Sequence, residues 1–321
     1  MKRPVYFERA LFFSWYCGLG DCTFCYMSTL KDNKTDPKLA RRRFSSIFAE
    51  ALISKVMGWK IEFISGGYDS YTKDELVYLV KGVYEITGQK QWLNLGTLSK
   101  KELELFKPYT EGFAGTIETV NWELRKKVCP SKVLPPIFTS FEFCDELNIK
   151  KSITIIIGLG ETEDDIPELI KFIKEYNIDK ITFYALNPHE DTCFTKSPEK
   201  EYYATWIRKT RESFPTLPIV AGAWLDKTDY YKAVLEAGAT SITKIPSIRK
   251  FGSDEVREIV KSVEEAGCEF QGTLTEMPNV NWEKLVKDLP SETFDDKLKE
   301  EIVGKLNSYL KKMRKGSFTN N

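Results

Sequence analysis

The sequence predicts an α/β fold, a (β/α)₈ barrel of the TIM type followed by a helical C-terminal extension. Eight short runs rich in β-branched and aromatic residues are each followed by a segment with apolar residues at helical spacing. Residues 153–157, Ile-Thr-Ile-Ile-Ile, are nearly all apolar, as expected of a parallel strand buried on both faces. Eight strand–helix units in 321 residues favour a closed barrel, and an open doubly wound sheet is the competing arrangement.

The predicted helices and strands follow one another without a strong break in composition. Residues 44–56 place six apolar side chains on one helical face, and glycines follow several helical runs, as at Gly58 and Gly267, where a left-handed cap is favoured. The strands are expected at residues 10–16, 61–65, 92–95, 113–118, 153–157, 181–185, 217–221 and 240–244.

The pattern changes from about Gly272, where Pro278 and Pro290 precede a charged helical stretch at residues 295–315. We therefore expect a barrel domain over residues 1–271 and an extension over residues 272–321 that packs on it. Lysines and an arginine close the extension, and a solvated helix end favoured by the helix dipole is the simplest interpretation.

Composition narrows the classes of function. Lysine plus arginine and aspartate plus glutamate both number 47, so no overall basic field is present to attract nucleic acid. No apolar run approaches the roughly 20 residues of a membrane span, and the N-terminus has no apolar signal region. We expect a cytoplasmic protein without membrane or nucleic-acid partners. The single histidine, His189, disfavours a conventional zinc or mononuclear iron enzyme.

Three of the seven cysteines, Cys17, Cys22 and Cys25, lie within nine residues directly after the first predicted strand. The carboxyl end of a barrel strand is where active sites form, and glycines between the first two cysteines allow a tight loop. Three thiolates on a four-iron cluster leave one iron open to a small chelating ligand. A zinc knuckle without its fourth ligand and chance buried thiols are the alternatives. The other cysteines are expected to be buried thiols: Cys129, Cys144, Cys193 and Cys268.

The three cysteines, with the aromatic Phe24 just before the third, resemble the radical S-adenosylmethionine (SAM) superfamily. Four residues separate Cys17 from Cys22 here, where the superfamily usually has three, and two separate Cys22 from Cys25. The resemblance implies a 4Fe-4S cluster on these cysteines and S-adenosyl-L-methionine bound to its open iron. The reduced cluster would cleave SAM to a 5′-deoxyadenosyl radical.

Further segments resemble the biotin synthase and HydE-like subgroup, in the same order along the chain. Residues 65–69, Ser-Gly-Gly-Tyr-Asp, are similar to the glycine-glycine-glutamate motif that holds the SAM amino group, with Tyr68 in place of the acid. Residues 115–119 are similar to a segment whose acid meets the SAM ribose, which implies that role for Glu118. The arginine that pairs the SAM carboxylate in those relatives is absent, and Lys132 is the nearest basic residue.

Residues 158–162, Gly-Leu-Gly-Glu-Thr, and residues 185–192 also resemble this subgroup, in segments that would meet adenine and SAM. His189 would make either a structural hydrogen bond or a substrate contact. No general base or other catalytic residue is assigned. The residues that the resemblance assigns to SAM are Phe24, Gly66, Gly67, Tyr68, Thr116, Glu118, Lys132, Ile157, Gly158, Leu186 and Asn187.

Within the subgroup, a lengthened first cysteine interval resembles HmdB, the maturase of the mono-iron hydrogenase. This resemblance implies hydrogenase maturation through biosynthesis of the iron-guanylylpyridinol cofactor, with a low-potential electron donor and a small-molecule substrate, for which a pyridinol precursor is a candidate. The second-cluster cysteines of biotin synthase are missing, since Asn94 and Thr154 stand in those strands. The alternatives are a HydE-like or biotin-synthase-like enzyme with another small substrate, and a non-catalytic iron–sulfur or zinc scaffold.

Overall fold

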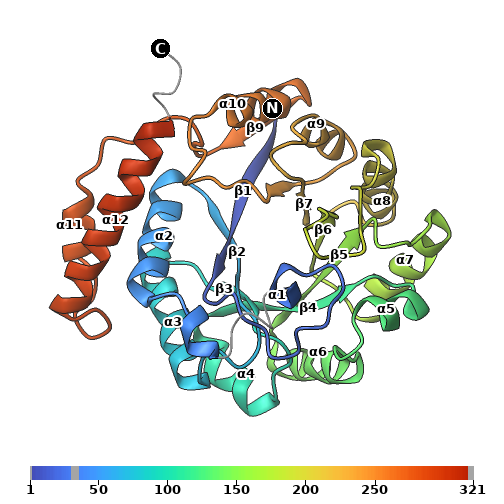
Figure 1. Cartoon of the computed structure of the whole chain (residues 1–321), viewed down its shortest axis with the longest axis horizontal. Helices are drawn as coiled ribbons and strands as arrows, with labels where there is room; N and C mark the ends of the chain where they lie inside the picture. Colours follow the sequence, from blue (N-terminus) through green and yellow to red (C-terminus); the bar gives the residue numbers. More distant parts are fainter. Residues whose placement is uncertain (1, 30–35, 317–321) are drawn as a thin grey trace.

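The computed structural model describes residues 2–29 and 36–316 and confirms the predicted barrel (Figure 1). Eight parallel strands follow one another in chain order, and pairing of the first with the second and the eighth closes the ring. The strands are β1 (Arg3–Phe12), β2 (Lys60–Ser65), β3 (Gln91–Asn94), β4 (Thr110–Glu118), β5 (Lys150–Ile157), β6 (Lys180–Ala185), β7 (Ile219–Gly222) and β8 (Ser241–Thr243).

Helices alternate with the strands and surround the barrel (Figure 1). No helix of the described segments is long and apolar enough to cross a membrane. The α-helices are α1 (Tyr26–Thr29), α2 (Phe44–Met57), α3 (Lys73–Thr87), α4 (Lys100–Phe106), α5 (Trp122–Val128), α6 (Pro135–Leu147), α7 (Ile166–Glu175), α8 (Lys200–Ser213), α9 (Asp229–Glu236), α10 (Asp254–Glu265), α11 (Trp282–Lys287) and α12 (Asp296–Gly316).

The first strand differs from the prediction. It covers residues 3–12 rather than 10–16, because charged residues hid its beginning. Glu8 lies inside the barrel, 3.4 Å from the ammonium of Lys180, and the guanidinium of Arg9 contacts Glu50 at 2.9 Å. A further strand, β9 (Cys268–Gln271), pairs in parallel with the start of β1 and was not predicted. A charged residue inside a strand therefore marks an internal ion pair here rather than a loop.

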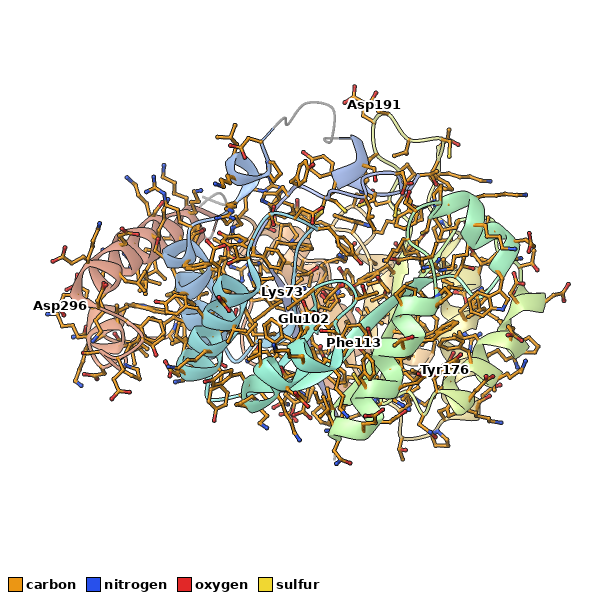
Figure 2. All side chains as sticks on the ribbon, turned by 90° about the horizontal axis from the view of Figure 1, so that it is seen from below. Lys73, Glu102, Phe113, Tyr176, Asp191 and Asp296 are labelled. Atoms are coloured by element: carbon orange, nitrogen blue, oxygen red, sulfur yellow. The ribbon has the colours of Figure 1, made fainter. Side chains whose placement is uncertain are left out.

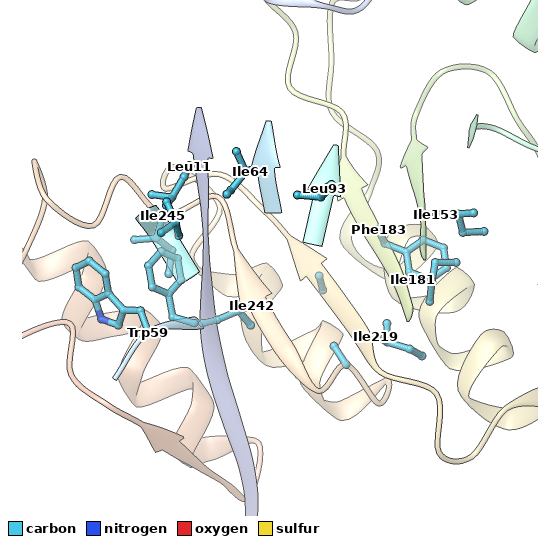
Figure 3. Close-up of a cluster of buried hydrophobic side chains, with 14 of the residues drawn as sticks. Leu11, Trp59, Ile64, Leu93, Ile153, Ile181, Phe183, Ile219, Ile242 and Ile245 are labelled. Atoms are coloured by element: carbon cyan, nitrogen blue, oxygen red, sulfur yellow. The ribbon is translucent and has the colours of Figure 1, made fainter. Parts of the chain in front are cut away.

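The apolar core lies between the strands and the surrounding helices. Ile153 is paired with Ile181 across β5 and β6, and Ile181 is paired in turn with Ile219 on β7. All three are fully buried, and Figure 3 shows them with other members of this core. Close packing of these β-branched side chains holds the strand ends, and hence the loops that follow them, in fixed relative positions.

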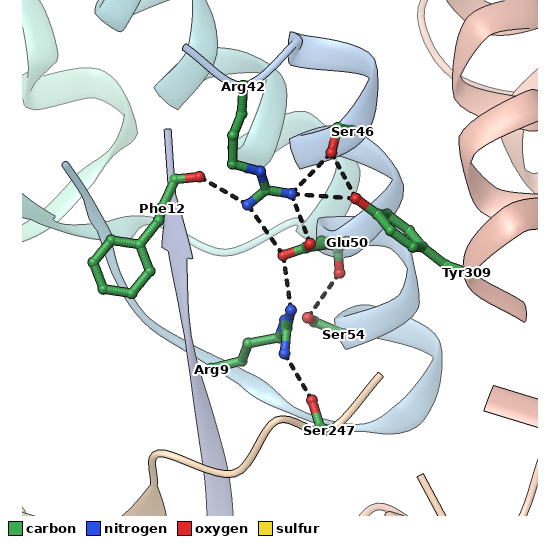
Figure 4. A network of polar contacts seen from close by, with 8 residues as sticks. All are labelled: Arg9, Phe12, Arg42, Ser46, Glu50, Ser54, Ser247 and Tyr309. Carbon is green, nitrogen blue, oxygen red and sulfur yellow. Dashed lines mark hydrogen bonds and ion pairs between the residues drawn. The ribbon is translucent and has the colours of Figure 1, made fainter. Parts of the chain in front are cut away.

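The C-terminal extension packs on the barrel through α12, which lies against α2 on its outer side (Figure 1). Helix α2 is therefore buried on both faces, whereas its sequence predicted a single apolar face. Between α2 and α12, Glu50 accepts from Arg9 at 2.9 Å and from Arg42 at 2.6 Å, and Tyr309 of α12 bonds Ser46 at 2.6 Å (Figure 4). This polar network joins the extension to the first strand and the first long helix.

Replacing Glu50 with Gln is expected to destabilise the fold by about 3–5 kcal/mol, because two buried guanidiniums lose their counter-charge. Burial opposes ionisation of Glu50, but Arg9 and Arg42 outweigh burial and lower the pKa of its carboxyl. A lowered folded-state pKa means that this stabilisation is complete above the unfolded value of about 4.3 and is lost as pH falls through the folded value. Thermal melting of wild type and variant should therefore differ most above about pH 5 and converge in acid.

The exposed Glu300 of α12 provides the matched control for the Glu50 experiment. Glu300→Gln should leave the melting temperature unchanged at every pH. A Glu50→Gln protein whose melting temperature followed that of the wild type from neutral pH into acid would contradict a stabilising role for the network.

Candidate active site

The cysteine loop, residues 13–25, leaves the carboxyl end of β1 and lies against the end of β2. The backbone N–H of Phe13 donates to the carbonyl of Ser65 at 2.8 Å, and that of Gly18 donates to the carbonyl of Tyr68 at 3.2 Å. Two backbone contacts thus tie the loop to residues 65–68. The loop lies at the barrel end predicted from the sequence.

The glycines after β2 allow this close approach. A Cβ on Gly67 would overlap the carbonyl oxygen of Tyr16 and would lie 2.5 Å from the Cα of Cys17. A Cβ on Gly66 would overlap the ring of Phe13. Real Cβ atoms do not approach other atoms so closely, so these two positions form a cradle that only glycine permits. The cradle fixes where the first cysteine begins its turn.

The other side of the loop is fixed by α5. The N–H of Thr23 donates to the carbonyl of Val128, the last residue of α5, at 2.9 Å. A tight turn follows, in which the N–H of Cys25 donates to the carbonyl of Cys22 at 3.0 Å, and the chain then enters α1. The loop is therefore anchored on residues 65–68 and on α5, with Cys17 and Cys22 before the second anchor and Cys25 just after it.

Two of the thiols act electrostatically on the third. Burial is the largest cause that raises the pKa of Cys25, and both Cys22 and Cys17 add to the increase. A hydrogen bond with Cys129, and then burial, raise the pKa of Cys22. Each thiol is partly exposed, while Cys129 is buried. The cysteine loop thus brings its sulfur atoms into one region, with a fourth thiol beside Cys22.

The loop also carries unpaired buried oxygens. Within the described segments, Oδ1 of Asp21 and Oγ1 of Thr23 are buried without a hydrogen-bond partner. Among residues 2–29 and 36–316, no group of three or more histidine, cysteine or acidic side chains is placed to hold a single metal ion. A four-iron cluster differs from a single ion in offering a separate iron to each thiolate. Three thiols on one anchored loop and a glycine cradle beside them fit such a cluster.

Glu118 and Lys132 form a largely buried ion pair at the end of β4, with the ammonium 2.7 Å from the carboxylate. Glu118 has φ of +70°, a conformation that is costly for a residue with a Cβ, and it follows an irregularity in the pairing of β4 with β5. Burial opposes the charge on Lys132, but Glu118 together with Cys22 and Cys129 outweighs burial and raises the pKa of the ammonium. Backbone strain of this kind is concentrated at active sites and ligand-binding sites.

The resembling families use an arginine to pair the SAM carboxylate. Arg125 is the arginine nearest to that position in this chain, but it has a different task. Its Nε donates to the carbonyl of Ile117 at 2.8 Å, and its Nη1 donates to the carbonyl of Lys132 at 2.6 Å. Arg125 is buried and binds backbone on both sides of the Glu118–Lys132 pair. It thereby holds the pair in place.

An apolar cluster lies beside the cysteine loop and brings together two of the residues that the resemblance assigned to SAM. Phe24 and Leu186 belong to it, and Ile156 is its member from β5, whereas Ile157 faces the main core. Gly158, with φ of +111°, turns the chain away, and the carboxylate of Glu161 accepts from its N–H at 2.7 Å. The members of the apolar cluster are Val128, Cys129, Ile156, Leu159 and Leu186, with Cys22, Phe24, Leu124, Tyr184 and Phe194 packed against them.

The remaining assigned residues lie at the ends of the same strands. The Tyr68 ring lies over Gly96 at the end of β3, and burial raises the pKa of its hydroxyl. Thr116 on β4 and Asn187 after β6 are half-buried. His189 packs on Tyr26, with ring centroids 5.7 Å apart, so the loop after β6 meets the start of α1, directly after the cysteine loop. Figure 2 places Asp191 of this loop at one extreme of the molecule.

One prediction about the cysteines was wrong. Cys129, Cys144 and Cys268 are buried, as expected, but Cys193 is exposed. Cys193 lies in the irregular segment between β6 and α8, which belongs to neither a strand nor a helix. Composition alone cannot tell a loop thiol from a core thiol.

Sequence reasoning missed four polar residues inside the barrel mouth. Glu62 is fully buried, and its carboxylate accepts from Thr243 at 2.5 Å and from the Tyr184 hydroxyl. Lys244 follows directly after β8. The one available signal was Glu62 itself, a lone acid within the apolar run of β2. Side chains from β2, β6 and β8 meet only once the barrel has closed.

Comparison with known proteins agrees with this geometry. The family model of the radical SAM superfamily matches residues 14–173, which include the cysteine loop, the glycine cradle and the Glu118–Lys132 pair. An uncharacterized protein of Methanocaldococcus jannaschii is 38% identical over 323 residues, covering 96% of this chain and 89% of that protein.

Two solved structures share the fold. The crystal structure of methylornithine synthase, PylB, matches with a TM-score of 0.67 and 22% identity, over 83% of each chain. The FeFe-hydrogenase maturase HydG from Carboxydothermus hydrogenoformans matches with a TM-score of 0.64 and 15% identity, over 98% of this chain and 82% of that one. Because the family model covers the same loop and strand ends that the fold brings together, this chain belongs to the radical SAM superfamily and is a radical SAM enzyme.

Proposed function

We propose that this enzyme holds a 4Fe-4S cluster on Cys17, Cys22 and Cys25 and acts in the biosynthesis of the iron-guanylylpyridinol cofactor of mono-iron hydrogenase. The observation that carries the cluster assignment is the seating of the cysteine loop on the Gly66–Gly67 cradle. The cluster, when bound, would supply the electron that cleaves SAM to methionine and a 5′-deoxyadenosyl radical, which takes a hydrogen atom from the substrate.

The residues of this chain have distinct tasks in holding SAM. The backbone of residues 66–68 lies beside the cysteine loop and suits the SAM amino group. The Glu118 carboxylate suits the ribose hydroxyls, from which it would accept. The Lys132 ammonium has three N–H donors and spends one on Glu118, so it can also serve the SAM carboxylate in place of the absent arginine. Phe24 and Leu186 supply apolar surface for adenine, whereas Ile157, whose side chain faces the core, can contribute only backbone, as Gly158 and Asn187 can. Thr116 lies near Glu118 on β4.

The apolar cluster supports a second task, the exclusion of water and stray hydrogen donors. A radical intermediate needs a site that closes off competing reactions, and packed aliphatic and aromatic side chains provide one. Phe24 and Leu186 lie on two different loops, after β1 and after β6, so both loops contribute to this enclosure.

The assignment to iron-guanylylpyridinol biosynthesis is supported by the four-residue interval between Cys17 and Cys22, which resembles HmdB. A low-potential electron donor and a small-molecule substrate follow from the family. A pyridinol precursor is the substrate that this proposal names.

Replacing Glu118 with Ala is expected to weaken SAM binding by about 10–100-fold, because hydrogen bonds to a charged group contribute about 1.5–3 kcal/mol. Equilibrium dialysis of the reconstituted protein with labelled SAM measures this. Glu123→Ala, an exposed acid on α5, is the matched control and should bind SAM as the wild type does. Unchanged SAM affinity in Glu118→Ala would contradict the ribose contact.

The proposed function is tested by reconstitution without oxygen, followed by measurement of iron, sulfide and 5′-deoxyadenosine. We expect about four irons per chain, the stoichiometry of a single 4Fe-4S cluster. Incubation with a deuterated pyridinol precursor should place deuterium in 5′-deoxyadenosine, which mass spectrometry detects. Cleavage of SAM without deuterium transfer would contradict the pyridinol role alone, whereas a chain that binds no iron would contradict the whole proposal.

A further inference from the structure

Lys244 is held in a strained conformation at the mouth of the barrel. It follows directly after β8 with φ of +69°, which is costly for a residue with a Cβ. Gly222 on the neighbouring strand leaves room for it, because a Cβ there would lie 2.9 Å from Lys244 Cγ and 2.6 Å from Tyr184 Cδ1. The strain and the glycine together direct the lysine stem over β7, toward Tyr184 on β6.

The Lys244 ammonium is surrounded by aromatic rings rather than by acids. Its Nζ lies 4.3 Å from the ring centroid of Tyr184, 5.9 Å from that of Phe12 and 6.0 Å from that of Trp224. Among residues 2–29 and 36–316, it forms no ion pair within 4 Å and donates no hydrogen bond. The three N–H donors of this half-buried ammonium are therefore available to a ligand.

Burial raises the pKa of the Glu62 carboxyl and Lys244 partly offsets this increase, but the two side chains form no ion pair. The Glu62 carboxylate already accepts from Thr243 at 2.5 Å and from the Tyr184 hydroxyl. The acid below the lysine is thus satisfied by neutral donors. A partly desolvated ammonium without a close counter-ion is an unfavourable arrangement that a bound anion would relieve.

A row of aromatic side chains connects Lys244 with the cysteine loop. The rings of Trp224 and His189 meet edge to face with centroids 6.1 Å apart, and His189 packs in turn on Tyr26, which directly follows Cys25. Tyr184, whose ring faces the ammonium, also packs against the apolar cluster that contains Phe24. Lys244 therefore faces the same barrel mouth as the proposed cluster and SAM residues.

We propose that Lys244 binds the carboxylate of a small aromatic carboxylic acid, whose ring lies between Trp224 and Tyr184. This inference rests on the proposed function and names the substrate class of that same site. A compact ammonium recognises a carboxylate as a point charge, and the flanking rings favour a planar apolar body. The carboxylate would hold the substrate, so that its ring faces the loop after β1.

The test compares benzoate with benzamide as probes, because the two have the same ring and differ in charge. Ligand-observed NMR on the reconstituted holoenzyme with SAM should detect benzoate binding with a Kd of about 1 mM, a typical value for so small a ligand. Benzamide should bind at least about tenfold more weakly. Lys244→Met should lose the preference for benzoate, and Lys244→Arg should retain it. Lys232→Met, which alters an exposed ammonium on α9, should bind benzoate as the wild type does.

Iron content and SAM cleavage, measured in the same samples, keep this inference separate from the proposed function. A wild type with a full complement of iron that binds benzoate and benzamide equally overturns the carboxylate site alone. Benzoate binding by Lys244→Met with wild-type affinity also overturns it. The wild-type comparison of the two probes needs no variant, so poor folding of Lys244→Met would not obscure the result.

Discussion

Cys22→Ala is expected to abolish assembly of the cluster and to reduce formation of 5′-deoxyadenosine by about 100-fold or more, as loss of one member of an interdependent site does. Cys22 lies between the two anchors of the cysteine loop, the Gly18–Tyr68 and Thr23–Val128 hydrogen bonds, and its carbonyl accepts from the N–H of Cys25. Alanine leaves those backbone bonds in place, so the loop should keep its path while one iron loses its ligand. Iron and sulfide analysis after anaerobic reconstitution measures the loss.

Two further cysteines make the Cys22 experiment specific. Cys193→Ala removes an exposed thiol on the loop after β6 and should leave iron content unchanged. Cys129→Ala removes the buried thiol that bonds Cys22, and it should also leave the cluster intact if Cys22 is the ligand. A Cys129→Ala protein without iron, beside a Cys22→Ala protein with iron, would transfer the assignment to Cys129.

Much of the fold could be predicted because the information is local. The run at residues 153–157 is apolar throughout, and glycines such as Gly58 end helices with positive φ, so strand and helix can be read from neighbouring residues. The first strand could not be placed correctly, because the information that identifies it is not local. The partners that neutralise Glu8 and Arg9 are Lys180 and Glu50, which are distant in sequence.

The same distinction between local and long-range information applies to the candidate site. The cysteine loop and the glycines after β2 are short motifs, so their residues could be named from the sequence. The seating of one on the other depends on β1 and β2 being neighbours in the barrel. The sequence placed Lys244 only at the end of the last predicted strand and gave it no role in the site, because its significance depends on Gly222, Tyr184 and Trp224, which lie elsewhere in the chain.

Gly67→Ala tests whether the cradle positions the cysteines. The added methyl would overlap the Tyr16 carbonyl oxygen and press on the Cα of Cys17, both backbone atoms that cannot rotate away. The loop must therefore move, and a displacement of about 1 Å at a reacting centre can cost about 100-fold in rate. We expect lower iron content and a loss of SAM cleavage of that order, measured on protein whose far-ultraviolet circular dichroism matches the wild type.

Gly304→Ala is the matched control, because it adds the same methyl where no atom lies within 4 Å. Gly304 lies inside α12, where alanine is favoured over glycine by about 0.5–1 kcal/mol, so this variant should melt at the same or a slightly higher temperature and bind iron fully. Both variants exchange a hydrogen for a methyl, so a difference between them reflects where the methyl lies and not what was added. If Gly67→Ala assembled its cluster and cleaved SAM as Gly304→Ala does, the glycine cradle after β2 would not be what positions the first cysteine.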